Sequence, residues 1–463
     1  MMKFEPLWIS EISALPALGV PVKSDMSFDI AIIGGGFVGL WSAIWLKTLE
    51  PSLRIAVLER GKIGHGASGL NGGFLMSWWP KIGRLVNLAG KEDAVWLADQ
   101  TTQNVDEMSN FLAQEQVDTE FERAGWIWTA TSQKHAQAWK GVVDKAGSLG
   151  REHIFETLSC EEVARRTGSR VHIAGIYERV NAKVHPAKLG YSLGLIAQRR
   201  GVEIYEGAEV SLITQGRKVQ LRVGKHTVSS DQLVIASNIA AEHLPELRRS
   251  MVLVTSAIVA TAPIPERLEE IGWTGGETVT DSQTRLNYYR TTRSGRIVYG
   301  MGVGALSYGN RLTPAVYSDL SGIRITEQNF RRAYPMLIDV PLEYGWSGPI
   351  DRTYDGLPLI GRFHNAPNIS YGVGWSGNGV GPSRIGGRIL AGLTLNRTER
   401  WTDNSFVNRV GRKFPPEPIR YFAGSTVRAS VARKDDCEIE GRSAPIYHRV
   451  LAKLAPAGTE DKD

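Results

Sequence analysis

The chain has few cysteines, no long apolar run and no cluster of metal-binding side chains. Its 463 residues include two cysteines, Cys160 and Cys437, which excludes a disulfide framework or a CxxC knuckle and favours a reducing cytoplasm. The nine histidines are scattered without an HxxxH pair, so we expect no metal site. No stretch approaches the roughly 18 consecutive apolar residues of a membrane span, so we expect no membrane partner.

Charge of one sign is also not concentrated anywhere. The formal net charge is +6, and the chain lacks the dense Lys/Arg stripe with interleaved aromatics of a nucleic-acid surface, so we expect no nucleic-acid partner. The mild positive excess favours anionic ligands. With 42% hydrophobic and 22% charged residues the composition is typical of a globular protein, and a chain of this length is expected to form two or more lobes.

Glycine, by contrast, is abundant, with 50 residues, and its first cluster lies in a βαβ pattern. Residues 28–33 (FDIAII) and 55–58 (IAVL) predict buried parallel strands, with a helix over 38–49 between them. The turn after the first strand carries GxGxxG at Gly34, Gly36 and Gly39. In this pattern the first glycine permits the tight turn, the second lets a pyrophosphate approach the backbone, and the third lets helix and strand pack closely.

A carboxylate closes the second strand of this unit. Glu59 lies twenty positions after Gly39, where a carboxylate accepts hydrogen bonds from ribose hydroxyls and repels a 2′-phosphate. The unit therefore predicts dinucleotide binding, with the phosphates at the helix N-terminus, and disfavours NADP. By itself it does not distinguish NAD from FAD.

The remaining periodicity predicts the other elements. A helix over 91–117 and a strand at 125–129 are expected to form an insertion outside the nucleotide-binding core. After a helix at 186–198, strands that return to this core are expected at 202–205, 210–213, 219–223 and 233–236. Strands of a second sheet are expected at 252–262, 285–291 and 296–301. Later helices are expected at 326–334, at 383–395 and, within a basic and proline-broken tail, near 425–434.

Three later segments complete a set of motifs. Residues 64–73 (GHGASGLNGG) follow the acidic residue, residues 355–361 read DGLPLIG, and residues 372–382 (GVGWSGNGVGP) open a helix. In this order, and with the N-terminal βαβ unit, they resemble the FAD-dependent D-amino acid oxidase superfamily, in its glycine oxidase and sarcosine oxidase branch, over nearly the whole chain. Residues 77–81 (SWWPK) and 414–418 (FPPEP) are similar to a bacterial subgroup that includes aminophosphonate oxidoreductases.

The resemblance implies an α/β fold with an α+β substrate lobe. A Rossmann-like FAD-binding domain would be built from discontinuous segments, and an antiparallel sheet would form the substrate domain. The FAD-binding domain is expected at 1–90, 165–245 and 346–398. The substrate domain is expected at 91–164 and 246–345, and a C-terminal wrapping tail at 399–463.

The resemblance also assigns residues to FAD. The segment after the acidic residue would meet the pyrophosphate and pass under the flavin ring, and residues 377–380 would face its pyrimidine edge. Reduction puts negative charge on this edge, and the free amides of the helix after Gly381 would stabilise that charge. The expected contacts are Gly34, Gly36, Phe37, Val38, Gly39, Glu59, Arg60, Ser68, Gly69, Asn71, Gly72, Gly73, Val210, Ala236, Ser237, Gly348, Gly374, Gly377, Asn378, Gly379 and Val380.

We expect the FAD to be held non-covalently. Some relatives tether the flavin through a histidine or a cysteine. His65 is followed by Gly66 and does not fill the position of a tethering histidine, three residues ahead of the segment's glycine. Cys437 lies far beyond the flavin-edge turn, whereas the relatives place their cysteine before it.

The same resemblance implies that the chain would oxidise the C–N bond of a small amine or amino-acid-like substrate. The α-hydrogen would pass as hydride to flavin N5, and the imine would then be hydrolysed. A dry aromatic pocket lowers the pKa of a bound amine, so no general base is required and none is assigned. Tyr289 and Trp375 are the expected pocket walls beside the flavin, and Trp78, Trp79 and Tyr288 are further candidates.

One departure from the resemblance concerns substrate charge. Glycine oxidase-like relatives carry an arginine a few residues before the DG of their DGxPxIG segment, and it pairs with the substrate carboxylate. Ile350 occupies that position here, which predicts an amine without a free α-carboxylate held in the usual way. Arg352 or Arg290 could instead reach the pocket and bind an anionic aminophosphonate; for Arg352, a surface or FAD-phosphate contact is an equal alternative.

The motifs barely distinguish the possible electron acceptors. We expect reduced flavin to pass its electrons to O2, as in an oxidase; an electron carrier, as in a dehydrogenase, is the alternative. A non-catalytic flavin-binding protein would be indicated by a degraded pyrophosphate or flavin-edge motif, and neither is degraded. An NAD-only dehydrogenase would leave the turn at 374–379 unexplained. We expect a cytoplasmic enzyme with a small-molecule amine substrate.

Overall fold

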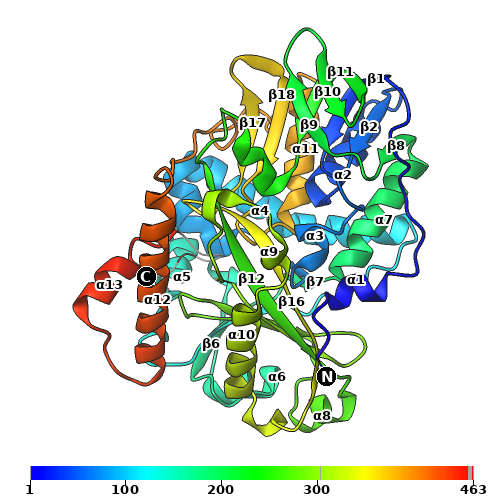
Figure 1. Cartoon of the computed structure of the whole chain (residues 1–463). Helices are drawn as coiled ribbons and strands as arrows, with labels where there is room; N and C mark the ends of the chain where they lie inside the picture. The colour runs from blue at the N-terminus through cyan, green and yellow to red at the C-terminus, as the bar shows by residue number, and fades with distance from the viewer. Residues whose placement is uncertain (1, 303, 457–460, 462–463) are drawn as a thin grey trace.

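The computed structural model describes residues 2–302, 304–456 and 461 and folds them around two large sheets (Figure 1). The first sheet occupies the upper part of the view and the second the lower part. Within these described ranges no helix is long and apolar enough to cross a membrane. The same ranges contain no group of three His, Cys, Asp or Glu side chains placed to hold a metal ion.

The first sheet contains the predicted βαβ unit. Its order is β17–β18–β11–β1–β2–β8, and all neighbours are parallel except β17 and β18. An antiparallel meander of β9 and β10 extends from β11. The strands are β1 (Met26–Ile33), β2 (Ile55–Leu58), β8 (Val202–Tyr205), β9 (Val210–Thr214), β10 (Val219–Val223), β11 (His226–Ile235), β17 (Leu359–Phe363) and β18 (Ala366–Val373).

Helices α2 (Phe37–Leu49) and α11 (Pro382–Thr394) pack closely together on one face of this sheet. Their approach requires a residue without a side chain, because a Cβ on Gly387 would lie 2.7 Å from Cβ of Trp41. Helix α7 (Pro186–Arg199) also contacts α2. The expected helices at 38–49, 186–198 and 383–395 therefore form where the pattern predicted them.

The long helix α4 (Ile82–Gln114) differs from the expectation in extent and position. It begins before residue 91 and continues across Gly90, whose φ of 76° interrupts the helical backbone. It does not lie outside the nucleotide-binding core, because Asn104 donates from Nδ2 to the Gly381 carbonyl at 3.0 Å. Its buried residues, including Leu97 and Met108, join the apolar cluster of α2 and α11, so packing on that face determines its place.

The second sheet carries the expected antiparallel strands. Its order is β16–β12–β15–β14–β13–β4–β6–β5, and β13 with β4 is its parallel pair. The expected strands at 125–129, 252–262, 285–291 and 296–301 correspond to β4, β12, β14 and β15. The strands are β4 (Trp126–Ala130), β5 (Glu156–Leu158), β6 (Ala174–Glu178), β12 (Met251–Thr261), β13 (Thr278–Asp281), β14 (Asn287–Thr291), β15 (Ile297–Met301) and β16 (Leu342–Thr353).

Two of the expected domain segments do not follow the sheets. Strand β6 lies within the segment 165–245, and residues 346–353 of β16 lie within 346–398, but both strands belong to the second sheet. β16 runs as one strand because it pairs with β12 from Leu342 opposite Thr261 to Thr353 opposite Met251. The division into an FAD-binding and a substrate domain stays a prediction.

The C-terminal tail is more helical than expected. Helix α12 (Ile419–Ile439) runs along one side of the molecule, and α13 (Ile446–Ala452) lies beside it (Figure 1). Residues 457–460 and 462–463 of the expected tail lie outside the described part. Helix α10 (Leu320–Ala333) begins earlier than predicted because Asp319 caps it, accepting from the Gly322 amide at 2.9 Å. The remaining elements are α1 (Leu7–Glu11), α3 (Ala67–Leu70), α5 (Lys140–Ser148), α6 (Cys160–Thr167), α8 (Pro265–Glu270), α9 (Pro314–Tyr317), β3 (Phe74–Leu75) and β7 (Ala182–Lys183).

Candidate functional site

A large cavity lies between the two sheets. Its volume is about 940 Å³, and its lining comes from the carboxyl ends of β1, β2 and β11 on one side and from β12, β13, β14 and β16 on the other. This volume lies in the upper part of the roughly 300–1,000 Å³ range of ligand and cofactor pockets. Ligands of such α/β sheets usually bind outside the carboxyl ends of the parallel strands.

The three glycines of the GxGxxG turn have different positions around this cavity. Gly34 has a φ of 108°, and a Cβ there would lie 2.4 Å from the carbonyl oxygen of Ala236. A Cβ on Gly39 would lie 2.0 Å from the Gly34 carbonyl oxygen, so this glycine permits packing. Gly36 caps α2 and lines the cavity, where the free amides of the first helical turn can bind an anion.

Glu59 also shapes this turn. Its Oε2 accepts a hydrogen bond from the Gly35 amide at 2.8 Å, and its Oε1 accepts from the Gly61 amide at 2.7 Å. Glu59 lines the cavity next to Arg60. The structure thus gives the carboxylate a turn-forming role that the sequence spacing did not indicate, while the ribose contact stays a prediction.

The segment 67–73 is closed by its own side chains and by α2. Ser68 Oγ accepts a hydrogen bond from the Phe37 amide at 2.9 Å. Asn71 Oδ1 accepts from the Gly73 amide at 2.7 Å, while its Nδ2 donates to the Ser68 carbonyl at 2.8 Å. The Asn71 amide group is therefore occupied within the segment and fixes the backbone that faces the cavity.

Buried side chains anchor the same segment from behind. The indole Nε1 of Trp8 donates to the Asn71 carbonyl at 2.9 Å, and that of Trp346 donates to the preceding carbonyl at 2.9 Å. Arg290 donates from Nη1 to the Val184 carbonyl at 2.5 Å, and its guanidinium lies 5.3 Å from the Trp8 ring centroid. Arg290 is outside the cavity lining, so the structure places this candidate substrate residue behind the segment. Burial lowers its pKa to about 10.

The turn at 374–380 is held by a carboxylate that sequence reasoning missed. Asp351 of β16 lines the cavity and accepts from the Gly374 amide at 2.6 Å, and also from the amides of Trp375 and Ser376. Burial raises the pKa of Asp351 to about 7. No sequence signal singled out Asp351, because the same strand also carries Glu343.

Two asparagines that line the cavity carry buried polar atoms without a hydrogen-bond partner among the described residues. Asn378 is 5% exposed, and neither its Oδ1 nor its Nδ2 has a hydrogen-bond partner among the described residues. Asn238 also lines the cavity with a buried and unpartnered Oδ1. Because buried polar groups are nearly always hydrogen-bonded, these atoms indicate a polar ligand. Together with the cradle at Gly36, they fit a flavin dinucleotide.

Adjacent tyrosines of β14 point to opposite faces of the second sheet. Tyr288 lines the cavity, and its Oη lies 2.8 Å from Ser256 Oγ. Tyr289, expected as a pocket wall, is outside the lining: its Oη lies 2.6 Å from His172 Nε2, and its ring stacks on Tyr299 at 4.8 Å. The alternation of side chains along a strand accounts for this difference.

The tryptophans divide in the same way. Trp375 lines the cavity and packs on α11, where a Cβ on Gly386 would lie 2.3 Å from its ring. Trp78 and Trp79 are fully buried in the main apolar cluster and do not line the cavity. Trp78 packs against Phe406 at 5.3 Å, so the structure gives these two side chains packing positions.

Ile350 and Arg352 both line the cavity from β16. They lie opposite Val254 and Val252 of β12, and Arg352 is 6% exposed. The position at which the resemblance led us to look for an arginine thus carries an aliphatic side chain in the cavity wall, and a buried guanidinium lies two residues farther along the strand.

Most of the expected FAD contacts line the cavity. Four do not: a Cβ on Gly39, Gly69, Gly73 or Gly374 would meet neighbouring atoms, so these glycines serve the packing of the turns. Contact with FAD itself stays a prediction for every residue. The expected contacts that line the cavity are Gly34, Gly36, Phe37, Val38, Glu59, Arg60, Ser68, Asn71, Gly72, Val210, Ala236, Ser237, Gly348, Gly377, Asn378, Gly379 and Val380.

Comparison with known proteins agrees with this geometry. The sequence profile of a family described as FAD dependent oxidoreductase matches residues 29–393. The chain belongs to this family. The expected superfamily, the expected fold class and the expected dependence on FAD are thereby confirmed, and the protein is an FAD-dependent oxidoreductase.

Individual relatives are distant but cover most of the chain. Gamma-glutamylputrescine oxidoreductase of Escherichia coli is 26% identical over 397 residues, 85% of this chain and 89% of that protein. An oxidoreductase named OrdL from Haemophilus influenzae is 25% identical over 384 residues, 80% of this chain and 84% of that protein. The crystal structure of glycine oxidase from Geobacillus kaustophilus is similar in fold, with a TM-score of 0.68 at 20% identity, covering 83% of this chain and 100% of that one.

Proposed function

We propose that this FAD-dependent oxidoreductase oxidises the C–N bond of a small amine. FAD, when bound, supplies the two-electron oxidation, and the imine product is then hydrolysed by water. The unpartnered side-chain amide of Asn378 and the glycine turns support the binding of FAD on one side of the cavity. The names of the relatives, gamma-glutamylputrescine oxidoreductase and glycine oxidase, support amine chemistry on the substrate side.

The chain's own residues favour a neutral amine. Leu286, Tyr288 and Trp375 line the cavity, and such an apolar and aromatic wall lowers the pKa of a bound ammonium group by disfavouring its charge. Burial raises the pKa of Tyr288 well above its ordinary range, so the phenol stays a hydrogen-bond donor. Asp351 accepts hydrogen bonds from amides of the 374–376 turn, and we assign it this positioning role. A neutral amine needs no general base, and none is assigned.

One observation carries the choice of substrate class. Ile350 lines the cavity, and a substrate carboxylate buried against its aliphatic side chain would be costly. We therefore propose that the substrate is an amine that places no α-carboxylate against Ile350, where an arginine would otherwise be needed to bind it. A γ-glutamylated diamine, as named for the Escherichia coli relative, has such an amino group.

Anaerobic bleaching of the flavin tests this proposal. Simple amines, N-methylated amines and a γ-glutamyl diamine are expected to bleach the purified protein faster than glycine, sarcosine or D-amino acids. Ile350→Arg is expected to gain bleaching by glycine, whereas the matched control Ile350→Leu is not. A strong preference of the native protein for glycine, sarcosine or a D-amino acid would contradict the proposal.

A second candidate substrate is an anionic aminophosphonate. Its support is Arg352, a buried guanidinium in the cavity wall two residues from Ile350 on the same strand. If an aminophosphonate bleaches the flavin, Arg352→Met should abolish that bleaching with the FAD content unchanged. Retained bleaching in this variant would exclude the route.

We also propose non-covalent FAD and either O2 or an electron carrier as acceptor. Among the described residues that line the cavity there is no cysteine, and the histidine is His243 rather than His65; Cys160 and Cys437 lie on α6 and α12. Reoxidation of the reduced protein by air and by an artificial acceptor, followed at the flavin absorbance, distinguishes the two acceptors. A cytoplasmic location stays a prediction from the scarcity of cysteine.

A further inference from the structure

A short loop of the second sheet forms part of the cavity wall. The loop, residues 282–286, joins β13 to β14, and Thr284 and Leu286 line the cavity together with Thr280 and Tyr288 of the two strands. The glycine turns expected to hold FAD come from the first sheet and its helices, so this loop lies on the substrate side. Whatever fixes the loop therefore fixes the shape of that wall.

The base of the loop is held by its own residues. Asp281, the last residue of β13, accepts hydrogen bonds from the backbone amide of Asn287 at 2.9 Å and from Asn287 Nδ2 at 2.7 Å. The amide of Leu286 donates to the Gln283 carbonyl at 3.1 Å. These bonds close the two ends of the loop and leave its middle, Thr284 and Arg285, to another partner.

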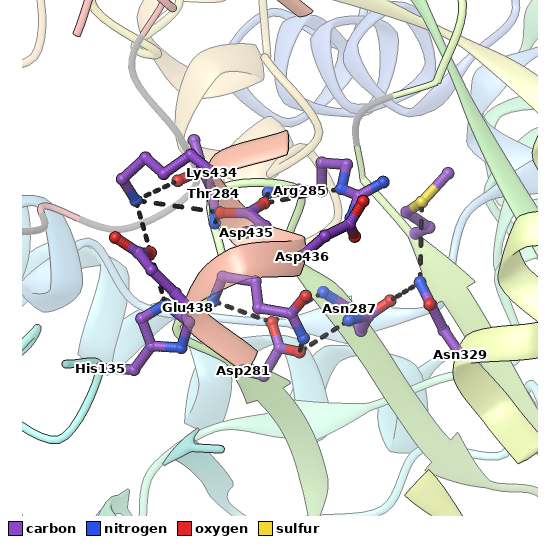
Figure 2. Close-up of polar contacts among 12 residues, drawn as sticks. His135, Asp281, Thr284, Arg285, Asn287, Asn329, Lys434, Asp435, Asp436 and Glu438 are labelled. Atoms are coloured by element: carbon purple, nitrogen blue, oxygen red, sulfur yellow. Dashed lines mark hydrogen bonds and ion pairs between the residues drawn. The ribbon is translucent and has the colours of Figure 1, made fainter. Parts of the chain in front are cut away.

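That partner is a carboxylate of the C-terminal helix. Asp435 of α12 is 0% exposed; its Oδ1 accepts from the Thr284 amide at 3.1 Å, and its Oδ2 accepts from the Arg285 amide at 2.7 Å (Figure 2). The Arg285 side chain lies along the same helix, with Nε 3.6 Å from Asp435 and an ion pair to Asp436. Because the Asp435 carboxylate is fully buried, its two oxygens need donors, and the amides of Thr284 and Arg285 supply them.

The helix is itself fixed at this point. Lys434 Nζ donates to Glu438 Oε2 at 2.8 Å and to Thr284 Oγ1 at 3.3 Å. Glu438 Oε2 lies 3.1 Å from Nε2 of His135, which comes from a distant part of the chain (Figure 2). Contacts of Lys434 and Glu438 thus fix α12 on either side of Asp435 along the sequence, so that Asp435 can position the loop.

We propose that Asp435 is a positioning residue for the substrate: it fixes the backbone of Thr284 and Arg285 and thereby the substrate wall of the cavity. The identity of the substrate rests on the proposed amine oxidation, but the hold on the loop does not. Helix α12 lies beyond residue 393, where the family match ends. The inference thus assigns part of the substrate site to a segment outside the matched region.

Asp435→Asn tests this proposal on the FAD-loaded full chain. Each carboxylate oxygen accepts one amide, whereas Asn offers one oxygen and an NH2 group that would face an N–H donor, so at least one bond is lost. Hydrogen exchange of the peptide covering 282–287 is expected to become about tenfold faster or more, as for loss of a charged hydrogen bond. The KM for the best bleaching amine is expected to rise about tenfold, with a smaller change in kcat and unchanged FAD content.

Asp436→Asn is the matched control. It removes the side-chain ion pair to Arg285 from the neighbouring position and keeps both backbone bonds to Asp435, so exchange and KM should stay near those of the native protein. The native protein alone also provides a test, because its 282–287 peptide should be protected like that of β14; rapid exchange there would overturn the proposal.

Three results with Asp435→Asn would also overturn it. The first is unchanged exchange at 282–287, and the second is faster exchange with an unchanged KM. The third is a fall in FAD content that accounts for the lost activity, which would assign Asp435 a general structural role instead. If the native protein oxidises no amine, the proposed function fails, while the exchange measurement still decides whether Asp435 holds the loop.

Discussion

Replacing Asp351 by Asn tests how the carboxyl that holds the 374–376 turn responds to pH. Burial raises the pKa of this group to about 7, from an ordinary value near 3.8, so the folded chain binds the proton more tightly than the unfolded chain. The stability that this proton contributes is fully present below the unfolded pKa and is lost as the pH rises through the folded pKa. Asn does not titrate, so the variant does not lose this stability as the pH rises.

The size of the effect follows from the shift. One pKa unit corresponds to about 1.4 kcal/mol, so a rise of about three units corresponds to roughly 4 kcal/mol over the whole range, of which roughly 2 to 3 kcal/mol falls between about pH 5 and 8. Replacing one of the accepting oxygens by NH2 adds a penalty of roughly 1–3 kcal/mol. This penalty is independent of pH, so the trend with pH isolates the titration.

Urea unfolding of the FAD-loaded protein at several pH values from about 5 to 8 measures this trend. The urea concentration at the unfolding midpoint is compared between Asp351→Asn and the native protein. The value of the variant minus that of the native protein is expected to increase as the pH rises. Asp339→Asn serves as a control, because the Arg267 side chain lowers the pKa of that exposed carboxyl and it stays ionised throughout. A flat or falling difference for Asp351→Asn would refute the reasoning.

Four further predictions concern the cofactor site and a second buried carboxyl. Acid precipitation should release the yellow chromophore, and colour in the pellet would contradict non-covalent binding. Gly36→Val should leave the purified protein colourless, because the new side chain enters the phosphate cradle, where even a Cβ lies 2.8 Å from Ser68 Oγ; stoichiometric flavin would refute this. Glu59→Ala should raise the Kd for FAD about 10- to 100-fold, since two turn-forming acceptors are lost with the ribose contact, and an unchanged Kd in flavin titration would argue against it. Glu178→Gln should gain stability relative to the native protein from pH 5 to 8 in thermal unfolding, because burial raises the pKa of Glu178 to about 7; a falling difference would contradict that sign.

The features that could be predicted from the sequence are those with a short-range physical cause. The positions of Gly34, Gly36 and Gly39 are set by a tight turn, a helix N-terminus and close packing, each within a few residues. Glu59 follows from the length of one βα unit. The turn at 374–380 was recognisable because a glycine-rich segment leads directly into a helix. In each case the constraint and the residue lie on the same stretch of chain.

The features that could not be predicted depend on pairing between distant segments. Tyr288 and Tyr289 are adjacent aromatics on a strand buried along most of its length, so no polar alternation indicated which faces the cavity. The place of β16 in the second sheet follows from its long pairing with β12. Asp351 and Asp435 accept backbone amides from segments far away in the sequence. No local pattern identifies such an acceptor.

The two ends of the chain contribute to the cavity from outside the family match. Trp8 precedes residue 29 and holds the segment at Asn71, while Asp435 follows residue 393 and holds the loop at Thr284. The first contact supports the side of the cavity expected to bind the flavin, and the second supports the side expected to bind the substrate. Within the match, the turns that suit FAD can stay similar among relatives with different named activities. The walls that a substrate meets include Ile350 and the 282–286 loop, which lie within the match, and we expect α12 to contribute to substrate specificity from outside it through its hold on that loop.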